Sequence, residues 1–163
     1  MNETQSYLQM MVESLRRKDE ALTRIIEKNK AQADCIHDKD YGDIDWDRFN
    51  VLIAEKETLI DRINELDAGF QSLYDRVGPE VKNDPSSYKE EIRTLQDLIS
   101  TLTDKGVEIQ TQEERNRTRI ERVLMGAKKE IRRSRKSMQV VSNYYKSMSD
   151  PDADNSGAVD KKK

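Results

Sequence analysis

The chain has 163 residues, of which 37% are charged and 34% are hydrophobic, with three prolines and a net charge of −3. This length suits one domain, and so high a content of mixed charges favours long solvated helices over a thick two-sided sheet. The single cysteine, Cys35, excludes an intramolecular disulfide framework, and no stretch approaches the roughly 20 apolar residues of a membrane span.

The first predicted helix covers residues 2–38. Leucine or isoleucine recurs every seven residues from Leu8 to Ile36, with Asn29 interrupting the row. Such spacing places the apolar side chains on one face of a helix. Asn2 and Gln5 have the spacing of a capping box, which supports a helix start at this point.

The second predicted helix covers residues 45–77. Asp45 is the expected N-cap, and Gly78 with Pro79 is expected to end the helix. Apolar residues recur at intervals of three and four between these limits and form the broadest apolar face in the chain. We therefore expect this helix to be the central one of the core.

The third predicted helix covers residues 87–148, with Pro85 and the Ser87–Glu90 capping-box pair at its start. Its apolar row stops after Ile109, and the ten residues 110–119 contain no apolar side chain. A second row then begins, in which Leu124, Ile131, Met138 and Tyr145 are seven residues apart and Ala127, Ser134, Val141 and Met148 lie between them.

These patterns predict an all-α fold, an elongated antiparallel bundle or coiled coil of three long helices in a single domain over residues 1–148. The third helix is expected to run out of neighbours near Arg119. Beyond that point it either stays extended or folds back, with Gly126 as one candidate position, to make a fourth helix. Residues 149–163 are polar and contain proline and glycine, which predicts a disordered tail.

Neither a metal site nor an enzyme is predicted. The final residues, DADNSGAVDKKK, begin like a calcium loop, but Lys163 stands at position 12, where such a loop requires glutamate. The aspartates between Asp38 and Asp47 suit turns and a helix N-cap better than a metal. With one histidine, His37, and scattered glycines, the sequence offers no nucleophile dyad and no phosphate loop. We expect no cofactor and no small-molecule ligand.

A partner-binding surface is the main functional expectation. The row that begins at Leu124 has no apolar counterpart left in the chain, so a partner would have to bury it. A homodimeric coiled coil is an open alternative. Nucleic-acid or polyanion binding is another, because ten basic residues lie between positions 115 and 136, opposed only by Glu121 and Glu130. These basic residues are Arg115, Arg117, Arg119, Arg122, Lys128, Lys129, Arg132, Arg133, Arg135 and Lys136.

The segment DWDRFNVLIAEKETLIDRINELD resembles the core helix of FlgN-type flagellar export chaperones, with a Lys-x-x-Leu-Ile element from Lys56 to Ile60. The chain end, with NYYKSM, a polar linker and Val159 followed by Asp-Lys-Lys-Lys, also resembles that family. Ala158 stands where many members carry an aromatic residue.

The resemblance implies a cytoplasmic type III export chaperone, and the N-terminus, which lacks the pattern of a signal peptide, fits that location. Its implied partners are the flagellar hook-associated (hook–filament junction) proteins and the export apparatus. We expect no membrane span, and nucleic-acid binding stays the alternative given above. The family holds its cargo with the C-terminal helical region. Carried onto this chain, the implied partner-binding residues are Leu124, Ala127, Ile131, Met138, Val141, Tyr144, Tyr145 and Met148.

Overall fold

The structure is a computed structural model that describes the backbone of residues 1–149 and the side chains up to residue 147. It contains three long helices, α1 (Glu3–Ile36), α2 (Trp46–Asn83) and α3 (Lys89–Ser149). Two short 3-10 turns, η1 (Tyr41–Asp43) and η2 (Pro85–Tyr88), lie between them. Residues 1–149 contain no strand, so the predicted all-α fold is confirmed. The predicted tail lies outside the described residues from position 150 onward.

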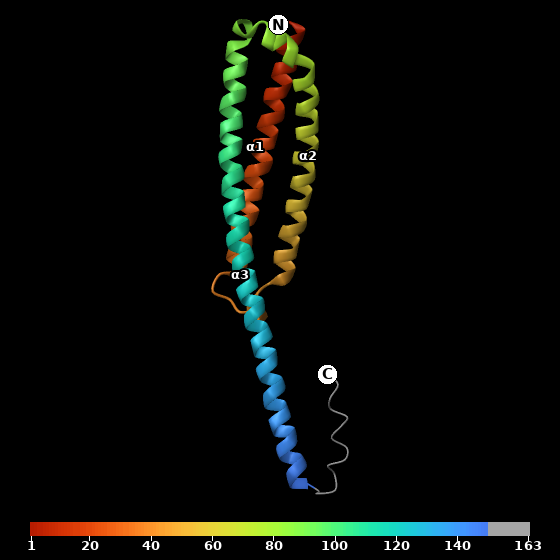
Figure 1. Cartoon of the computed structure of the whole chain (residues 1–163), viewed down its shortest axis with the longest axis vertical. Helices are drawn as coiled ribbons and strands as arrows, with labels where there is room; N and C mark the ends of the chain where they lie inside the picture. The colour runs from red at the N-terminus through yellow and green to blue at the C-terminus, as the bar shows by residue number, and fades with distance from the viewer. Residues whose placement is uncertain (150–163) are drawn as a thin grey trace. The chain divides into compact units, whose positions relative to one another are not determined.

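The chain divides into two units, Met1–Ile120 and Glu121–Lys163. In the first unit α1, α2 and the first half of α3 run side by side as a three-helix bundle (Figure 1). The described part of the second unit is the remainder of α3. This helix continues without a break through Gly126, so of the two predicted alternatives the extended helix is right and the folded-back fourth helix is wrong.

Contacts between side chains define the register of the bundle. Along α1 and α3 the hydrogen-bonded pairs Asn2–Tyr88, Gln5–Glu91 and Asp19–Lys105 are all 86 residues apart, so these two helices run parallel in register. Lys18 on α1 meets Asp67 on α2, and Lys28 meets Glu55, so α2 runs antiparallel to α1. The order is therefore up, down, up.

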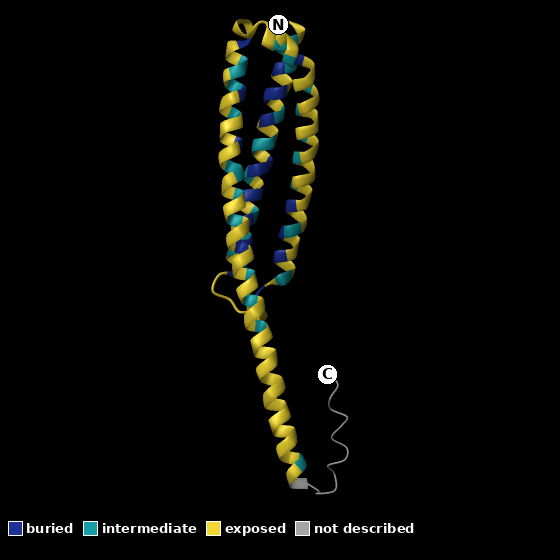
Figure 2. Ribbon diagram, viewed as in Figure 1, coloured by how far each residue is buried: buried dark blue, intermediate teal, exposed yellow. Residues whose placement is uncertain are grey.

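The core lies along α1, which contributes eleven buried residues against four from α2. Most of the apolar residues of α2 are only half-buried, and Val51 and Ile60 are exposed. The prediction that α2 is the central helix is therefore wrong, because two helices cover α1 whereas the broad face of α2 stays partly in solvent (Figure 2). The main cluster comprises Leu8, Met11, Val12, Leu15, Leu22, Val77, Tyr88, Leu95 and Leu102.

The predicted caps of the first two helices are confirmed. The Asn2 side chain accepts a hydrogen bond from the Gln5 backbone N–H at 2.7 Å, and the Gln5 side chain accepts one from Asn2 N–H at 3.0 Å. At the start of α2, the Asp45 carboxylate accepts from the Arg48 N–H at 3.0 Å. Each contact satisfies a backbone donor that the first helical turn would otherwise leave unpaired.

Two predicted boundaries between α2 and α3 are wrong. Pro79 lies inside α2, which continues to Asn83. Pro79 is in the last turns of an exposed helix, where water can satisfy the carbonyl that the missing N–H leaves free. The Ser87–Glu90 capping box is not formed, because Ser87 belongs to η2 and its hydroxyl donates to Asp84 Oδ2 at 2.6 Å.

A buried polar cluster joins all three helices of the first unit. Asn29 on α1 is 1% exposed, and its side-chain oxygen accepts a hydrogen bond from Lys56 Nζ on α2 at 2.8 Å. The same ammonium donates to both carboxylate oxygens of Glu113 on α3, at 3.0 and 2.9 Å. Gln112 accepts from Asn29 Nδ2, and Asn116 donates to the Asn29 carbonyl. The stretch of α3 without apolar residues therefore packs through polar contacts.

Replacing Lys56 with methionine tests this cluster. Glu113 is half-exposed and can be hydrated, but the Asn29 amide oxygen would be left buried without a donor. We expect Lys56→Met to lower the free energy of unfolding by about 1–3 kcal/mol, measured by urea denaturation followed by circular dichroism. The matched control is Lys28→Met, which breaks the more exposed Lys28–Glu55 pair between the same helices and is expected to cost less than about 1 kcal/mol. Equal losses in the two variants would contradict a special role for the cluster.

Candidate partner-binding site

The predicted site residues lie on the part of α3 that belongs to the second unit, where nearly every described side chain is exposed (Figure 2). Ala127 is half-buried, and the Met148 side chain lies outside the described residues. The other six side chains are exposed, at 42% for Leu124, 53% for Ile131, 72% for Met138, 52% for Val141, 59% for Tyr144 and 65% for Tyr145. Large apolar side chains exposed in this number on one helix indicate a surface that a partner can cover.

The helix geometry brings most of these residues onto one face. A residue advances about 100° around a helix, so residues alternately three and four positions apart form a narrow stripe. Leu124, Ala127, Ile131, Ser134, Met138, Val141 and Tyr145 follow that spacing, and we call them the apolar row. Tyr144 lies about 100° from Tyr145, at the border of the row. Its ring meets the Tyr145 ring edge-on at 5.7 Å.

The prediction missed Val123, a half-buried residue beside Leu124 at the same border of the row as Tyr144. The seven-residue spacing that starts at Leu124 does not include Val123. Val123 is seven residues beyond Asn116, which in turn is seven beyond Ile109, so counting onward from the bundle core would have found it. Two further exposed apolar residues, Met125 and Val140, lie outside the row and do not extend it.

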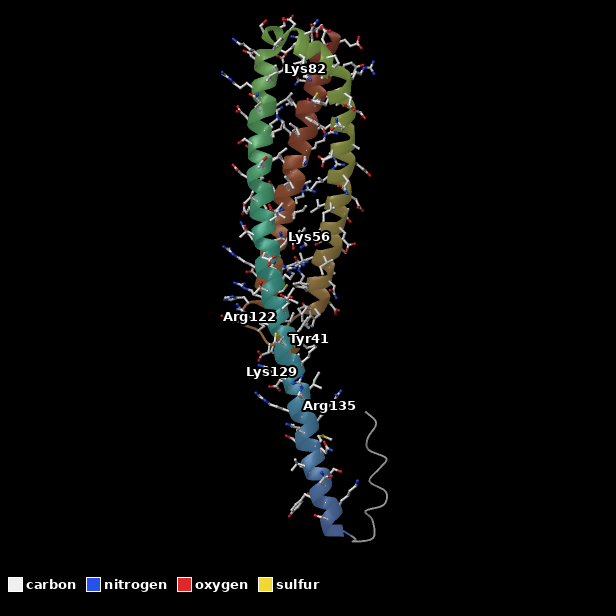
Figure 3. The ribbon with its side chains drawn as sticks, viewed as in Figure 1. Tyr41, Lys56, Lys82, Arg122, Lys129 and Arg135 are labelled. Carbon is white, nitrogen blue, oxygen red and sulfur yellow. The ribbon has the colours of Figure 1, made fainter. Side chains whose placement is uncertain are left out.

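The same helix is strongly basic. Residues 121–149 contain eight lysines and arginines against Glu121 and Glu130, a net charge of +6. Figure 3 labels Arg122, Lys129 and Arg135 on this helix. Arg122 and Lys129 are seven residues apart on the side opposite to the apolar row. The helix thus presents an apolar face and a basic face at once.

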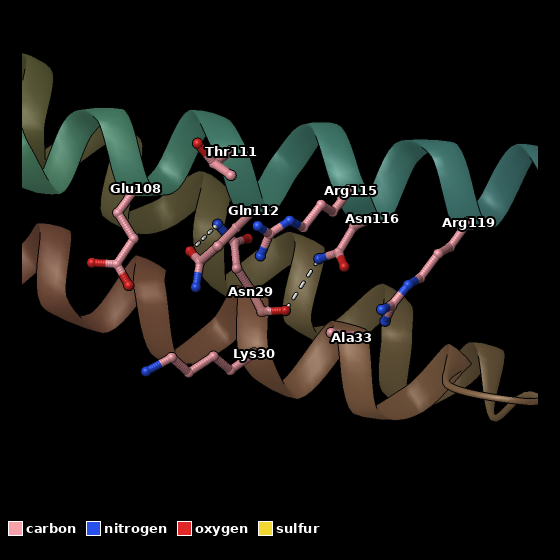
Figure 4. A pocket seen from close by; sticks show the side chains of 9 residues that line it. All are labelled: Asn29, Lys30, Ala33, Glu108, Thr111, Gln112, Arg115, Asn116 and Arg119. Atoms are coloured by element: carbon pink, nitrogen blue, oxygen red, sulfur yellow. Dashed lines mark hydrogen bonds between the residues drawn. The ribbon is translucent and has the colours of Figure 1, made fainter.

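A second candidate location is a surface pocket of about 480 Å³ between α1 and α3 of the first unit (Figure 4). Asn29, Gln112 and Asn116 form its hydrogen-bonded side, and Lys30, Arg115 and Arg119 bring positive charge to it. Within the described residues none of these three cations has an ion pair or hydrogen bond, and Glu108 is the one acid in the lining. The pocket is therefore suited to an anionic group. Sequence reasoning counted both arginines as basic residues but gave no sign of the pocket.

No family model, curated protein or solved structure matches the chain in the three comparisons made. Among the described residues, no helix combines the length and apolar content that crossing a membrane requires. The same described residues contain no group of three or more His, Cys, Asp or Glu side chains that could hold a metal ion.

The exposure of the apolar row can be tested by stability alone. Ile131→Asp introduces a carboxylate at an exposed position and is expected to change the free energy of unfolding by less than about 1 kcal/mol. Leu102→Asp places the same carboxylate in the core, where Leu102 is 8% exposed, and is expected to cost at least about 3 kcal/mol. Urea denaturation of both variants gives the comparison. A loss in Ile131→Asp as large as in Leu102→Asp would mean that Ile131 is covered in solution.

Proposed function

We propose that this chain is an export chaperone of the FlgN type, which holds amphipathic C-terminal segments of flagellar hook–filament junction proteins against the apolar row. The observation that carries the proposal is the row itself, whose side chains from Leu124 to Tyr145 are exposed apart from the half-buried Ala127. Covering apolar surface stabilises a complex by about 25 cal/mol for each Å² removed from water. A second amphipathic helix is the simplest element that fits a straight stripe of this kind.

The chemistry of the row suits more than one cargo. Met138 is flexible and polarisable, so it can adapt to different partner side chains. Tyr145 combines a large apolar ring with a hydroxyl that can stay in water, a combination typical of binding surfaces. Tyr144, which points from the border of the row, is a candidate contact to the cargo or to the export apparatus. We place this activity in the cytoplasm.

The segment that resembles the chaperone family has a different part in this proposal. Its Lys56 lies in the buried polar cluster of the first unit, and Leu59 is half-buried on the bundle side of α2. These residues therefore support the fold, whereas the cargo would be bound by α3. The assignment to the family rests on the sequence resemblance, and the assignment of the surface rests on exposure and spacing.

Polyanion or nucleic-acid binding is the second candidate function. It is favoured by the absence of ion pairs at Arg115 and Arg119 beside the α1–α3 pocket within the described residues. Such binding would weaken steeply with added salt, because it releases counterions from the polyanion. Charge reversal at Arg132 and Arg133 would reduce it. A homodimer that pairs two apolar rows is the third reading, and sedimentation at high concentration would reveal it.

Binding to cargo is the direct test. The purified chain, with and without residues 120–163, is combined with C-terminal segments of the junction proteins, and affinity is measured by pulldown and calorimetry. Ile131→Asp is expected to weaken binding at least about tenfold, which corresponds to 1.4 kcal/mol. Val140→Asp is the matched control, because Val140 is also exposed, at 67% against 53% for Ile131, but lies away from the row. It is expected to weaken binding less than about threefold, a loss below 1 kcal/mol.

Three outcomes would contradict the proposal. If the cargo segments do not bind the stably folded chain, the proposed function is wrong. Binding that survives deletion of residues 120–163 would move the site to the first unit. Equal losses in Ile131→Asp and Val140→Asp would show that the apolar row is not the contact surface.

A further inference from the structure

We propose that the partner of the apolar row is a helix with acidic residues along one border of its own apolar face. This inference rests on the proposed function, since it describes the partner of the same site. It starts from the two borders of the row, which differ in charge. On one border lie Lys128 and Arg135, seven residues apart and both exposed, with the exposed Glu121 seven residues before Lys128 on the same line. We call Lys128 and Arg135 the basic border.

The opposite border is less charged. It holds Glu130 and Tyr144, with Val123 nearer the start of the helix. In paired helices, the residues that flank the apolar stripe lie opposite the flanking residues of the partner helix. Their charges therefore determine which partner helix binds. Neither Lys128 nor Arg135 has an ion pair within the described residues, so both are available to a partner.

Charge argues against a second copy of this chain as the occupant. Each copy would bring a net charge of +6 over residues 121–149. Antiparallel pairing places like borders together, so Lys128 and Arg135 face either the same cations or Glu121 of the other copy, depending on the register. Parallel pairing places unlike borders together and gives two symmetry-related attractive contacts, between Glu130 of each copy and Arg135 of the other. These two contacts are few beside the net charge of +6 on each helix, so repulsion between the copies remains.

A different protein with the opposite charge removes this repulsion. Two carboxylates seven residues apart on one border of a partner helix would match the spacing of Lys128 and Arg135. Arginine can hold a carboxylate with two parallel hydrogen bonds, and lysine acts as a point charge. The charges on the borders would thus discriminate between partner helices that all have a suitable apolar stripe. A cation opposite Lys128 or Arg135 lowers the affinity.

The far side of the helix provides the matched control. Lys128→Glu with Arg135→Glu reverses the basic border, and Arg122→Glu with Lys129→Glu makes the same total change of charge opposite the row. The full-length chain is titrated with two fluorescent 28-residue helical peptides of identical apolar stripe. One peptide carries glutamate at two border positions seven residues apart, and its twin carries lysine there.

The glutamate peptide is expected to bind at least about tenfold more tightly than the lysine twin at 150 mM salt, or 1.4 kcal/mol. The border variant should reverse this preference. The far-side variant should keep it, because charges across the helix lie beyond about one Debye length of 8 Å from the partner border. Ile131→Asp should weaken both peptides, which assigns binding to the apolar row.

Several results would overturn the inference. If both peptides bind equally and Ile131→Asp removes both, the apolar row is a binding surface, as proposed above, but the acidic partner is wrong. If both double variants weaken binding of the glutamate peptide equally, the position of the charges on the helix does not matter. The helix would then attract any polyanion through its net charge. If neither peptide binds, or if the free chain is a dimer that Ile131→Asp dissociates, the acidic partner is likewise excluded.

Discussion

Helix length is the constraint on which the arrangement of this chain depends. At 1.5 Å per residue, α3 is about 92 Å long, whereas α1 and α2 are about 51 and 57 Å. Within the first unit α1 and α3 run in register with an offset of 86 residues. The described part of the second unit is a single helix, so no other described element of that unit covers its apolar row.

Much of this could be predicted from sequence, because helical spacing and capping are local properties. The all-α class and the caps at Asn2 and Asp45 follow from residues close together in the chain. The pattern did not decide whether the third helix continues through Gly126, as it does, or folds back. The exposure of the row from Leu124 onward could also be predicted, since no apolar segment was left to cover it. The central position of α1 could not be predicted. An apolar face shows that one side of a helix is buried, but it does not show how many neighbouring helices bury it.

The polar stretch of α3 was the harder problem. Ten residues without an apolar side chain suggested that contacts end there, yet Glu113 and Asn116 meet Lys56 and Asn29 inside the bundle. Long-range pairing of this kind leaves no local pattern in the sequence. Its physical value lies in specificity as well as stability. A shift of α1 by one turn along α3 would separate Asn29 from its partners and leave buried polar groups unpaired, so the cluster holds the helices in one register.

The exposure of Met138 also makes the surface of α3 sensitive to oxidants. Met11 lies in the bundle core, where few oxidants reach it, but most of the Met138 side chain is in solvent. Oxidation of a thioether to the sulfoxide turns a flexible apolar side chain into a polar one, and reductases reverse the change. The apolar row therefore contains one position whose polarity can be altered and restored chemically while the three-helix core is left as it was.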